Sequence, residues 1–172
     1  QNFSMSAEAD ATSPAARLAR LALRQDATAT NALNVLALQA QMRNETEKTR
    51  EIFRYSLALS RRELQPQLWT IEEAVGRGDI KGALRGYDTA LRTSSRAKEI
   101  LFPVLSTALV EPRVRAELLP IIASRPAWSG AFLAYLVNSS SEPLAALSFI
   151  RMAEKRGLAI TDDDRALLVN AL

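Results

Sequence analysis

The sequence predicts an all-α protein, folded as a right-handed α-solenoid of antiparallel helical hairpins with about ten helices. Three observations carry this prediction. Alanine, leucine, arginine and glutamate dominate the chain of 172 residues, and β-branched residues never alternate with polar ones over a long run. Turn signals recur roughly every 12 to 20 residues, which is the spacing expected of short helices.

The predicted helices are placed by their start and stop signals. Ser13-Pro14 combines an N-cap with a proline in the first turn, and predicts a helix that ends near Gln25. The next helices are expected over Thr30–Arg43, Asn44–Glu63, Pro66–Gly76 and, capped by Asp79, to about Ser94. Later helices are expected to begin at Ser95, Glu111-Pro112, Arg125-Pro126, Ser141-Glu142-Pro143 and Thr161-Asp162. Pro120 is expected to break or kink its helix.

Composition argues against an enzyme and against a bound metal or cofactor. The chain has no cysteine and no histidine, so disulfides, thiolate metal sites and the commonest general base are excluded. Glu72 and Glu73 are candidates for an acid/base pair, but neighbours on a helix point about 100° apart and no third group completes a site. Asp162–Asp164 could bind a hard cation, but helix capping is the favoured interpretation because no further oxygen ligands follow at loop spacing.

Charge and hydropathy exclude two classes of partner. The net charge is only +3, and basic residues alternate with acids, as in Arg43–Arg54, so no basic stripe for a nucleic acid is present. The aromatic residues sit among apolar neighbours and are expected to pack rather than stack on bases: Trp69, Tyr87, Trp128 and Tyr135. The longest apolar run, residues 100–110, contains Pro103 and is too short to span a bilayer.

Four of the six glycines fall within one stretch, AVGRGDIKGALRGYDTAL, at positions 76, 78, 82 and 86. A phosphate-binding loop would need a preceding strand and a Lys-Ser or Lys-Thr pair after the last glycine, and both are lacking. The adhesion tripeptide Arg77-Gly78-Asp79 is disfavoured because Asp79 is needed as an N-cap. The stretch is therefore interpreted as a turn between helices, in which Gly78 supplies a left-handed conformation. Gly82 and Gly86 are expected to allow close helix contact.

A period of 34 residues aligns much of the first hundred positions. The aligned pairs are Leu36 with Thr70, Ala37 with Ile71, Ala40 with Ala74, Asn44-Glu45 with Gly78-Asp79, Thr49 with Ala83, Phe53 with Tyr87, and Ser56-Leu57 with Ala90-Leu91. One period upstream, the second helix of a preceding unit is matched by Ala15, Ala19, Ala22-Leu23 and Asp26-Ala27.

This pattern resembles the tetratricopeptide repeat, which has small residues at positions 8, 20 and 27, aromatics near 11 and 24, and Gly-Asp at the internal turn. The chain departs from it at Ile71, which stands at the small position 8, and at Asn44-Glu45 in place of Gly-Asp. The resemblance implies a flexible segment 1–12, a half repeat 13–29 and repeats 30–63 and 64–97. Residues 98–172 are expected to continue the solenoid as divergent hairpins.

The resemblance also implies a concave groove, lined by the first helices, that holds an extended or helical peptide. The implied groove residues are Asn31, Asn34, Leu38, Gln41, Gln65, Leu68, Glu72 and Val75, followed by Phe102 and Ser106. The basic cluster that clamps a terminal carboxylate in some family members is missing, because Asn34 and Leu38 stand in its place. The alternative is that the divergent C-terminal half covers this face, which makes these residues core.

The sequence thus predicts a non-catalytic scaffold that binds a protein or peptide partner. The alternatives are a structural module that self-associates, as a homodimer, and a regulatory or extracytoplasmic domain of a larger membrane-anchored bacterial protein. A carboxylate- or lysine-based hydrolase of polysaccharide or lipid is the least favoured class. The 18 arginines against 4 lysines indicate a GC-rich bacterial genome. The compartment stays open between the cytoplasmic and periplasmic sides of the membrane, with a signal or anchor expected before Gln1 in one interpretation.

Overall fold

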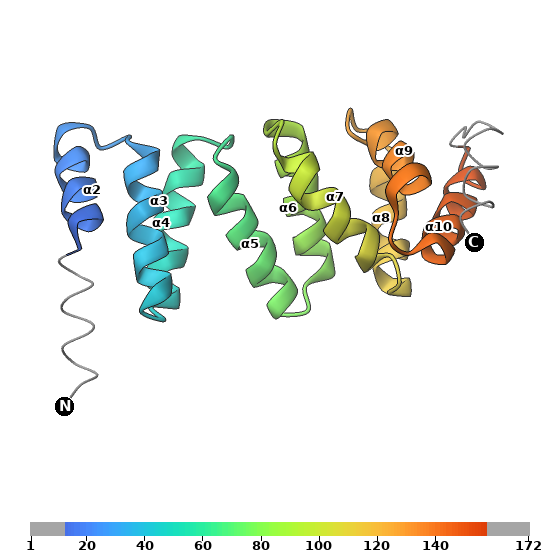
Figure 1. Cartoon of the computed structure of the whole chain (residues 1–172), viewed down its shortest axis with the longest axis horizontal. Helices are drawn as coiled ribbons and strands as arrows, with labels where there is room; N and C mark the ends of the chain where they lie inside the picture. Colours follow the sequence, from blue (N-terminus) through green and yellow to red (C-terminus); the bar gives the residue numbers. More distant parts are fainter. Residues whose placement is uncertain (1–12, 158–172) are drawn as a thin grey trace. The chain divides into compact units, whose positions relative to one another are not determined.

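The computed structural model describes residues 13–157, and within this range the chain is all-helical, with nine helices and no strand. This confirms the all-α class. The helices are α2 (Pro14–Gln25), α3 (Thr30–Met42), α4 (Thr46–Leu59), α5 (Leu64–Gly76), α6 (Ile80–Thr93), α7 (Ala97–Ala108), α8 (Pro112–Ala123), α9 (Ser129–Ser139) and α10 (Pro143–Glu154) (Figure 1). The segment 1–12 and the helix expected from Thr161, with Asp162–Asp164, lie outside the described residues.

The chain divides into two compact units, Gln1–Thr70 (unit 1) and Ile71–Leu172 (unit 2), and the boundary falls inside α5. In unit 1, α3 packs on both α2 and α4. Its core contains Ala37, Phe53 and Trp69, and the two aromatic rings lie 5.5 Å apart. One residue from each of three successive helices therefore builds this core.

In unit 2 the helices form two rows. α6 contacts α8 and α8 contacts α10, while α7 contacts α9. The rows are joined because α6 also contacts α7 and α9 contacts α10. Alternate helices thus lie side by side, as expected when each hairpin covers the apolar face of the next (Figure 1).

The two internal prolines do not end their helices. Pro103 lies inside α7 and Pro120 inside α8, which continues to Ala123, so of the break or kink expected at Pro120 the break does not occur. Pro120 is solvent-exposed, as is Ala116 one turn earlier. The Ala116 carbonyl, which loses its intrahelical donor to the proline, can therefore be hydrated.

The same turn occurs twice, 34 residues apart. Gly78 has φ +71° and Asn44 has φ +59°, so both residues are left-handed as they end a first helix. The next residue closes each turn identically, since Asp79 N donates to Ala74 O and Glu45 N donates to Ala40 O, both at 2.9 Å. The prediction for Gly78 is confirmed, and asparagine serves at the first turn because its side chain tolerates the left-handed region.

We expect Gly78→Ala to destabilise unit 2 by about 1–2 kcal/mol, the cost of a left-handed alanine. The penalty is purely backbone strain, because a Cβ at Gly78 would meet nothing within 4 Å. Gly78→Asn, which copies the first turn, is the matched control and should cost less than half as much. Urea unfolding followed by circular dichroism measures both changes. Equal losses from alanine and asparagine would contradict this account.

Tyr87 gives the fold a pH dependence. Burial raises the pKa of its hydroxyl above the ordinary value, and the negative charge of Glu72 raises it further. The folded state therefore favours the neutral phenol. Its contribution to stability is complete below the unfolded pKa of about 10 and is lost as the pH rises through the folded pKa.

We accordingly expect the free energy of unfolding to fall as the pH is raised above about 10, and Tyr87→Phe to remove that part of the fall. Urea titrations at several alkaline pH values measure the effect. Tyr55→Phe, at an exposed tyrosine of α4, is the control. A Tyr87→Phe profile parallel to that of the unmodified chain would show that Tyr87 is not responsible.

Candidate binding surface

The exposed side of α3 carries three of the predicted groove residues. Asn31, Leu38 and Gln41 are exposed, although the other side of α3 buries Ala37 and Ala40 completely. Residues spaced three or four apart share one face of a helix, which explains why 31, 34, 38 and 41 remain together on one side. This surface offers amides that can bond a peptide backbone and one leucine for an apolar side chain.

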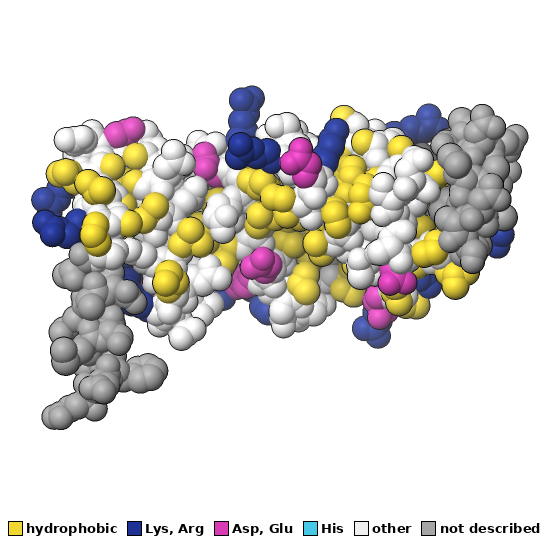
Figure 2. Space-filling model, in the orientation of Figure 1, with side chains coloured by type: hydrophobic (Ala, Val, Ile, Leu, Met, Phe, Trp, Pro, Cys, Tyr) yellow, Lys and Arg dark blue, Asp and Glu magenta, His cyan; other side chains and the backbone are white. Residues whose placement is uncertain are grey.

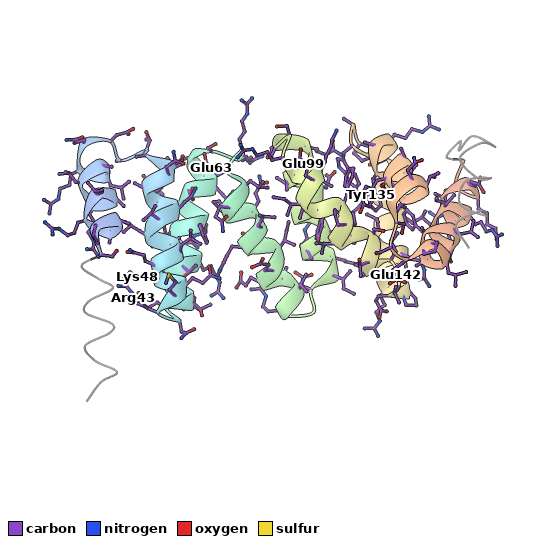
Figure 3. The ribbon with its side chains drawn as sticks, viewed as in Figure 1. Arg43, Lys48, Glu63, Glu99, Tyr135 and Glu142 are labelled. Atoms are coloured by element: carbon purple, nitrogen blue, oxygen red, sulfur yellow. The ribbon has the colours of Figure 1, made fainter. Side chains whose placement is uncertain are left out.

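Asn34, the fourth of these residues, is only half-buried but already makes internal hydrogen bonds. Its Nδ2 donates to Glu63 Oε2 at 3.1 Å, and its Oδ1 accepts from the Ser56 hydroxyl at 3.3 Å. Thr30 donates its hydroxyl to the other oxygen of Glu63 at 3.0 Å. The Glu63 carboxylate thus ties the residue before α5 to α3; Glu63 is labelled in Figure 3. Asn34 acts in this structure as a positioning residue of the scaffold.

Sequence reasoning missed Glu63. The signal that could have found it is its place immediately before a helix, where an acidic side chain commonly caps the next turn. Here the carboxylate instead bonds two residues of α3, more than 28 positions away in the chain. A contact of that range has no periodic signature in the sequence.

The four predicted groove residues of α5 are divided between the two units, because the boundary between the units falls inside this helix. In unit 1, Gln65 is exposed and Leu68 is half-buried. In unit 2, Glu72 and Val75 are exposed, Val75 to 60% of its surface. Within unit 1 the accessible candidates are therefore Asn31, Leu38, Gln41 and Gln65, and Leu68 is accessible in part.

Phe102 and Ser106 are not on an open surface. Phe102 is buried, with its ring centroid 5.2 Å from that of Phe132 and 5.7 Å from that of Tyr135. The buried Ser106 hydroxyl shares a 2.8 Å hydrogen bond with that of Ser140. The expectation that these two residues line a groove is corrected, because α9 and the residue that follows it cover them. At these two positions the structure agrees with the alternative, in which the C-terminal hairpins cover the predicted groove residues and make them core.

A second charged group closes the other end of the α3–α4 hairpin. Glu45 pairs with Arg43 at 3.0 Å and with Lys48 at 3.1 Å, and Figure 3 shows both cations near this turn. The hydrogen bond from Lys48 and the charge of Arg43 hold the pKa of Glu45 below its usual value. Lys48 is exposed whereas Arg43 is only 13% exposed, so the pair with Lys48 adds little stability and Arg43 is the partner held closer to the protein.

The glycine stretch builds a turn and a helix cap. α5 rather than a strand precedes it, and the Asp79 carboxylate accepts the Gly82 amide proton at 2.8 Å. The expected helix contact is found at Gly86, where a Cβ would lie 2.7 Å from Ile71 Cγ1. At Gly82 the expectation is wrong, because the atoms nearest to a Cβ belong to the Asp79 cap. Gly82 therefore leaves room for a capping side chain and not for a helix.

Glu72 and Glu73, the two carboxylates considered as an acid/base pair, have different surroundings. Glu73 pairs with Arg77 at 3.0 Å while Glu72 is exposed, so the two carboxylates do not converge. Across residues 13–157, no three acidic side chains come close enough to hold a metal ion. In the same range, no helix combines the length and hydrophobicity that crossing a membrane requires. Comparison of the chain with protein-family models, with curated proteins and with solved structures gives no match.

Proposed function

We propose that the chain is a non-catalytic interaction module, similar in kind to tetratricopeptide repeats, that binds a protein or peptide partner on the exposed side of α3. The proposal is supported above all by the open surface of Asn31, Leu38 and Gln41, on a helix whose other faces are held by α2 and α4. Because packing on two sides already holds α3 in place, a partner that binds its exposed side does not have to order this helix, and the entropy cost of binding is smaller.

The chemistry of this surface fits an extended or helical peptide. Amide side chains donate to and accept from a peptide backbone, while Leu38 and the half-buried Leu68 supply apolar contact. Glu63 fixes Asn34 and the start of α5, so the surface is pre-organised rather than formed on binding. The turn that occurs at both Asn44 and Gly78, 34 residues apart, supports the similarity to 34-residue helical repeats.

Two leucines of unit 1 allow a matched test, since Leu38 and Leu59 are each 37% exposed and lie on different helices. A random peptide library is selected on the immobilised full chain, and each recovered peptide is then titrated against Leu38→Glu and Leu59→Glu. We expect Leu38→Glu to weaken binding at least about tenfold, because it places a charge in the apolar contact, and Leu59→Glu to leave it unchanged. Peptides that bind both variants equally well, or a selection that enriches none, would overturn the proposal.

A further inference from the structure

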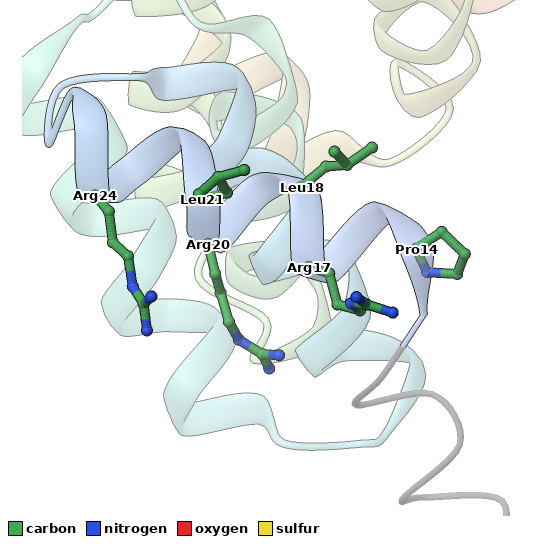
Figure 4. Close-up of a pocket in the computed structure, with 6 residues that line it drawn as sticks. All are labelled: Pro14, Arg17, Leu18, Arg20, Leu21 and Arg24. Atoms are coloured by element: carbon green, nitrogen blue, oxygen red, sulfur yellow. The ribbon is translucent and has the colours of Figure 1, made fainter.

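The outward face of α2 carries exposed leucines beside a row of arginines. Leu18 is 65% exposed and Leu21 is 53% exposed, whereas the opposite face of the helix buries Ala16 and Ala19. An open hollow on this face is lined by Pro14, Arg17, Leu18, Arg20, Leu21 and Arg24 (Figure 4). Figure 4 shows the arginines extending to one side and the leucines to the other, and Figure 2 shows basic and apolar side chains together over α2.

The 34-residue period shows what covers the corresponding face on α4. Ala15, Leu18 and Ala22 of α2 correspond to Thr49, Ile52 and Ser56 of α4. Thr49 and Ser56 are completely buried. The Thr49 hydroxyl lies 3.5 Å from the carbonyl oxygen of Ala37 on α3, and Ser56 bonds Asn34 on the same helix. On α4, this face is covered by the first helix of its own hairpin.

α6 repeats the arrangement in unit 2. Its corresponding residues Ala83 and Ala90 are buried, and Gly86 between them lies against Ile71 of α5. On α2 the equivalent face is open: Ala15 and Leu18 are exposed and Ala22 is half-buried. Of the described helices, none covers this face of α2 as α3 covers that of α4. Small residues on both sides of Leu18 would let a helix approach closely.

We infer that this face of α2 binds an α-helix of a partner protein that carries acidic residues along one edge. The helical form follows from α4 and α6, where the same positions accept a helix. The acidic edge follows from charge, because α2 contains three arginines and no aspartate or glutamate. Arg17 and Arg24 lie beyond Leu21, and their long side chains can reach a carboxylate at the rim of the docked helix.

Charge also decides against a second copy of the chain as the occupant. Two α2 faces related by a twofold axis would bring arginine against arginine. The hollow on α10, at the other end of the described chain, is also lined by basic residues, Arg151 and the following Lys155. An anionic membrane is disfavoured because alanines flank the leucines on the side away from the arginines, whereas an interfacial helix needs a broad face of large apolar residues.

The test uses the full chain and two stapled amphipathic peptides with the same alanine and leucine face, one with glutamates and one with lysines along its edge. We expect the glutamate peptide to bind by fluorescence anisotropy, and Leu18→Glu to weaken it at least about tenfold. Leu144→Glu, at a leucine of α10 that is 72% exposed, is the matched control and should have no effect. Reversal of charge in Arg17→Glu/Arg24→Glu should transfer the preference from the glutamate to the lysine peptide.

Several outcomes would overturn the inference. They are equal binding of the two peptides, binding insensitive to Leu18→Glu, or a chain that instead binds vesicles containing phosphatidylserine through Leu18. A dimer in light scattering that Leu18→Glu dissociates would assign the face to a second copy. The inference uses other residues than the α3 surface, so Leu38→Glu should leave binding of the glutamate peptide unchanged, and the two proposals can fail separately.

Discussion

Gly86→Ile is expected to destabilise unit 2 by about 3 kcal/mol, because a Cβ at this position already lies 2.7 Å from Ile71 Cγ1. Ile71 is buried and Cγ1 is the inner branch of its side chain, so it cannot swing away at low cost. The gain in helix propensity over glycine, about 1 kcal/mol at most, does not offset this overlap.

The first repeat shows how the overlap can be relieved. One period upstream of Ile71 and Gly86 stand Ala37 and Ile52, and Ile52 packs against the core cluster that contains Ala37. The large and small partners of this contact have exchanged places between the two repeats. If each pair places one isoleucine in an equivalent space between its two helices, this exchange accounts for Ile71 at a position where the repeat pattern calls for a small residue.

The double variant Ile71→Ala/Gly86→Ile copies the first repeat into the second. Alone, Ile71→Ala should cost about 2–4 kcal/mol through the cavity that it leaves. Together the two changes should cost much less than their sum, with a coupling free energy of about 2 kcal/mol or more. Urea unfolding of the four chains completes the cycle. Additive losses would show that the two side chains do not compete for one space.

Features set by local sequence or by periodicity could be predicted. The start of α2 at Pro14 and that of α10 at Pro143 follow from helix-start signals, and the left-handed turn at Gly78 follows from glycine. The buried positions 37, 49, 53 and 56 recur at 71, 83, 87 and 90 because the same contacts are built twice. These features can be predicted from the sequence because each depends on a few neighbouring residues or on the 34-residue period.

Features set by a particular distant partner could not be predicted. Phe102 and Ser106 fall at positions that are open in the resemblance, and only the packing of α9 and the residue after it buries them. The bonds of Asn34 depend on Glu63, and the two roles of Gly82 and Gly86 depend on whether a cap or a neighbouring helix lies opposite. In unit 1, the pattern therefore named residues of α3 that are exposed on one helix face, whereas in α7 it named two residues that are buried.

Asp88→Ala is expected to destabilise unit 2 by about 2–4 kcal/mol, because Asp88 holds the buried Trp128 in place. Its Oδ1 accepts the indole proton of Trp128 at 2.8 Å, and both oxygens accept from Arg92 Nε at 2.8 and 2.9 Å. Trp128 is only 1% exposed and meets Phe132 edge-on. Without Asp88 the N–H of the buried Trp128 loses a charged, partly buried acceptor, which is the largest part of the expected cost.

The bond between Asp88 and Trp128 also connects α6, which follows the 34-residue pattern, with the start of α9, which does not. Asp88 belongs to α6, the second helix of the clearest repeat, and Trp128 precedes α9, where no repeat motif is present.

Two further variants serve as controls. Asp88→Asn keeps a hydrogen-bond acceptor and should lose less than half as much stability as Asp88→Ala, while Trp128→Phe removes the indole donor. In the Trp128→Phe background, Asp88→Ala should cost only about 1 kcal/mol or less, since the exposed pair with Arg92 remains to be lost. A cycle measured by urea unfolding that gives Asp88→Ala the same cost in both backgrounds would show that the indole bond does not couple these helices.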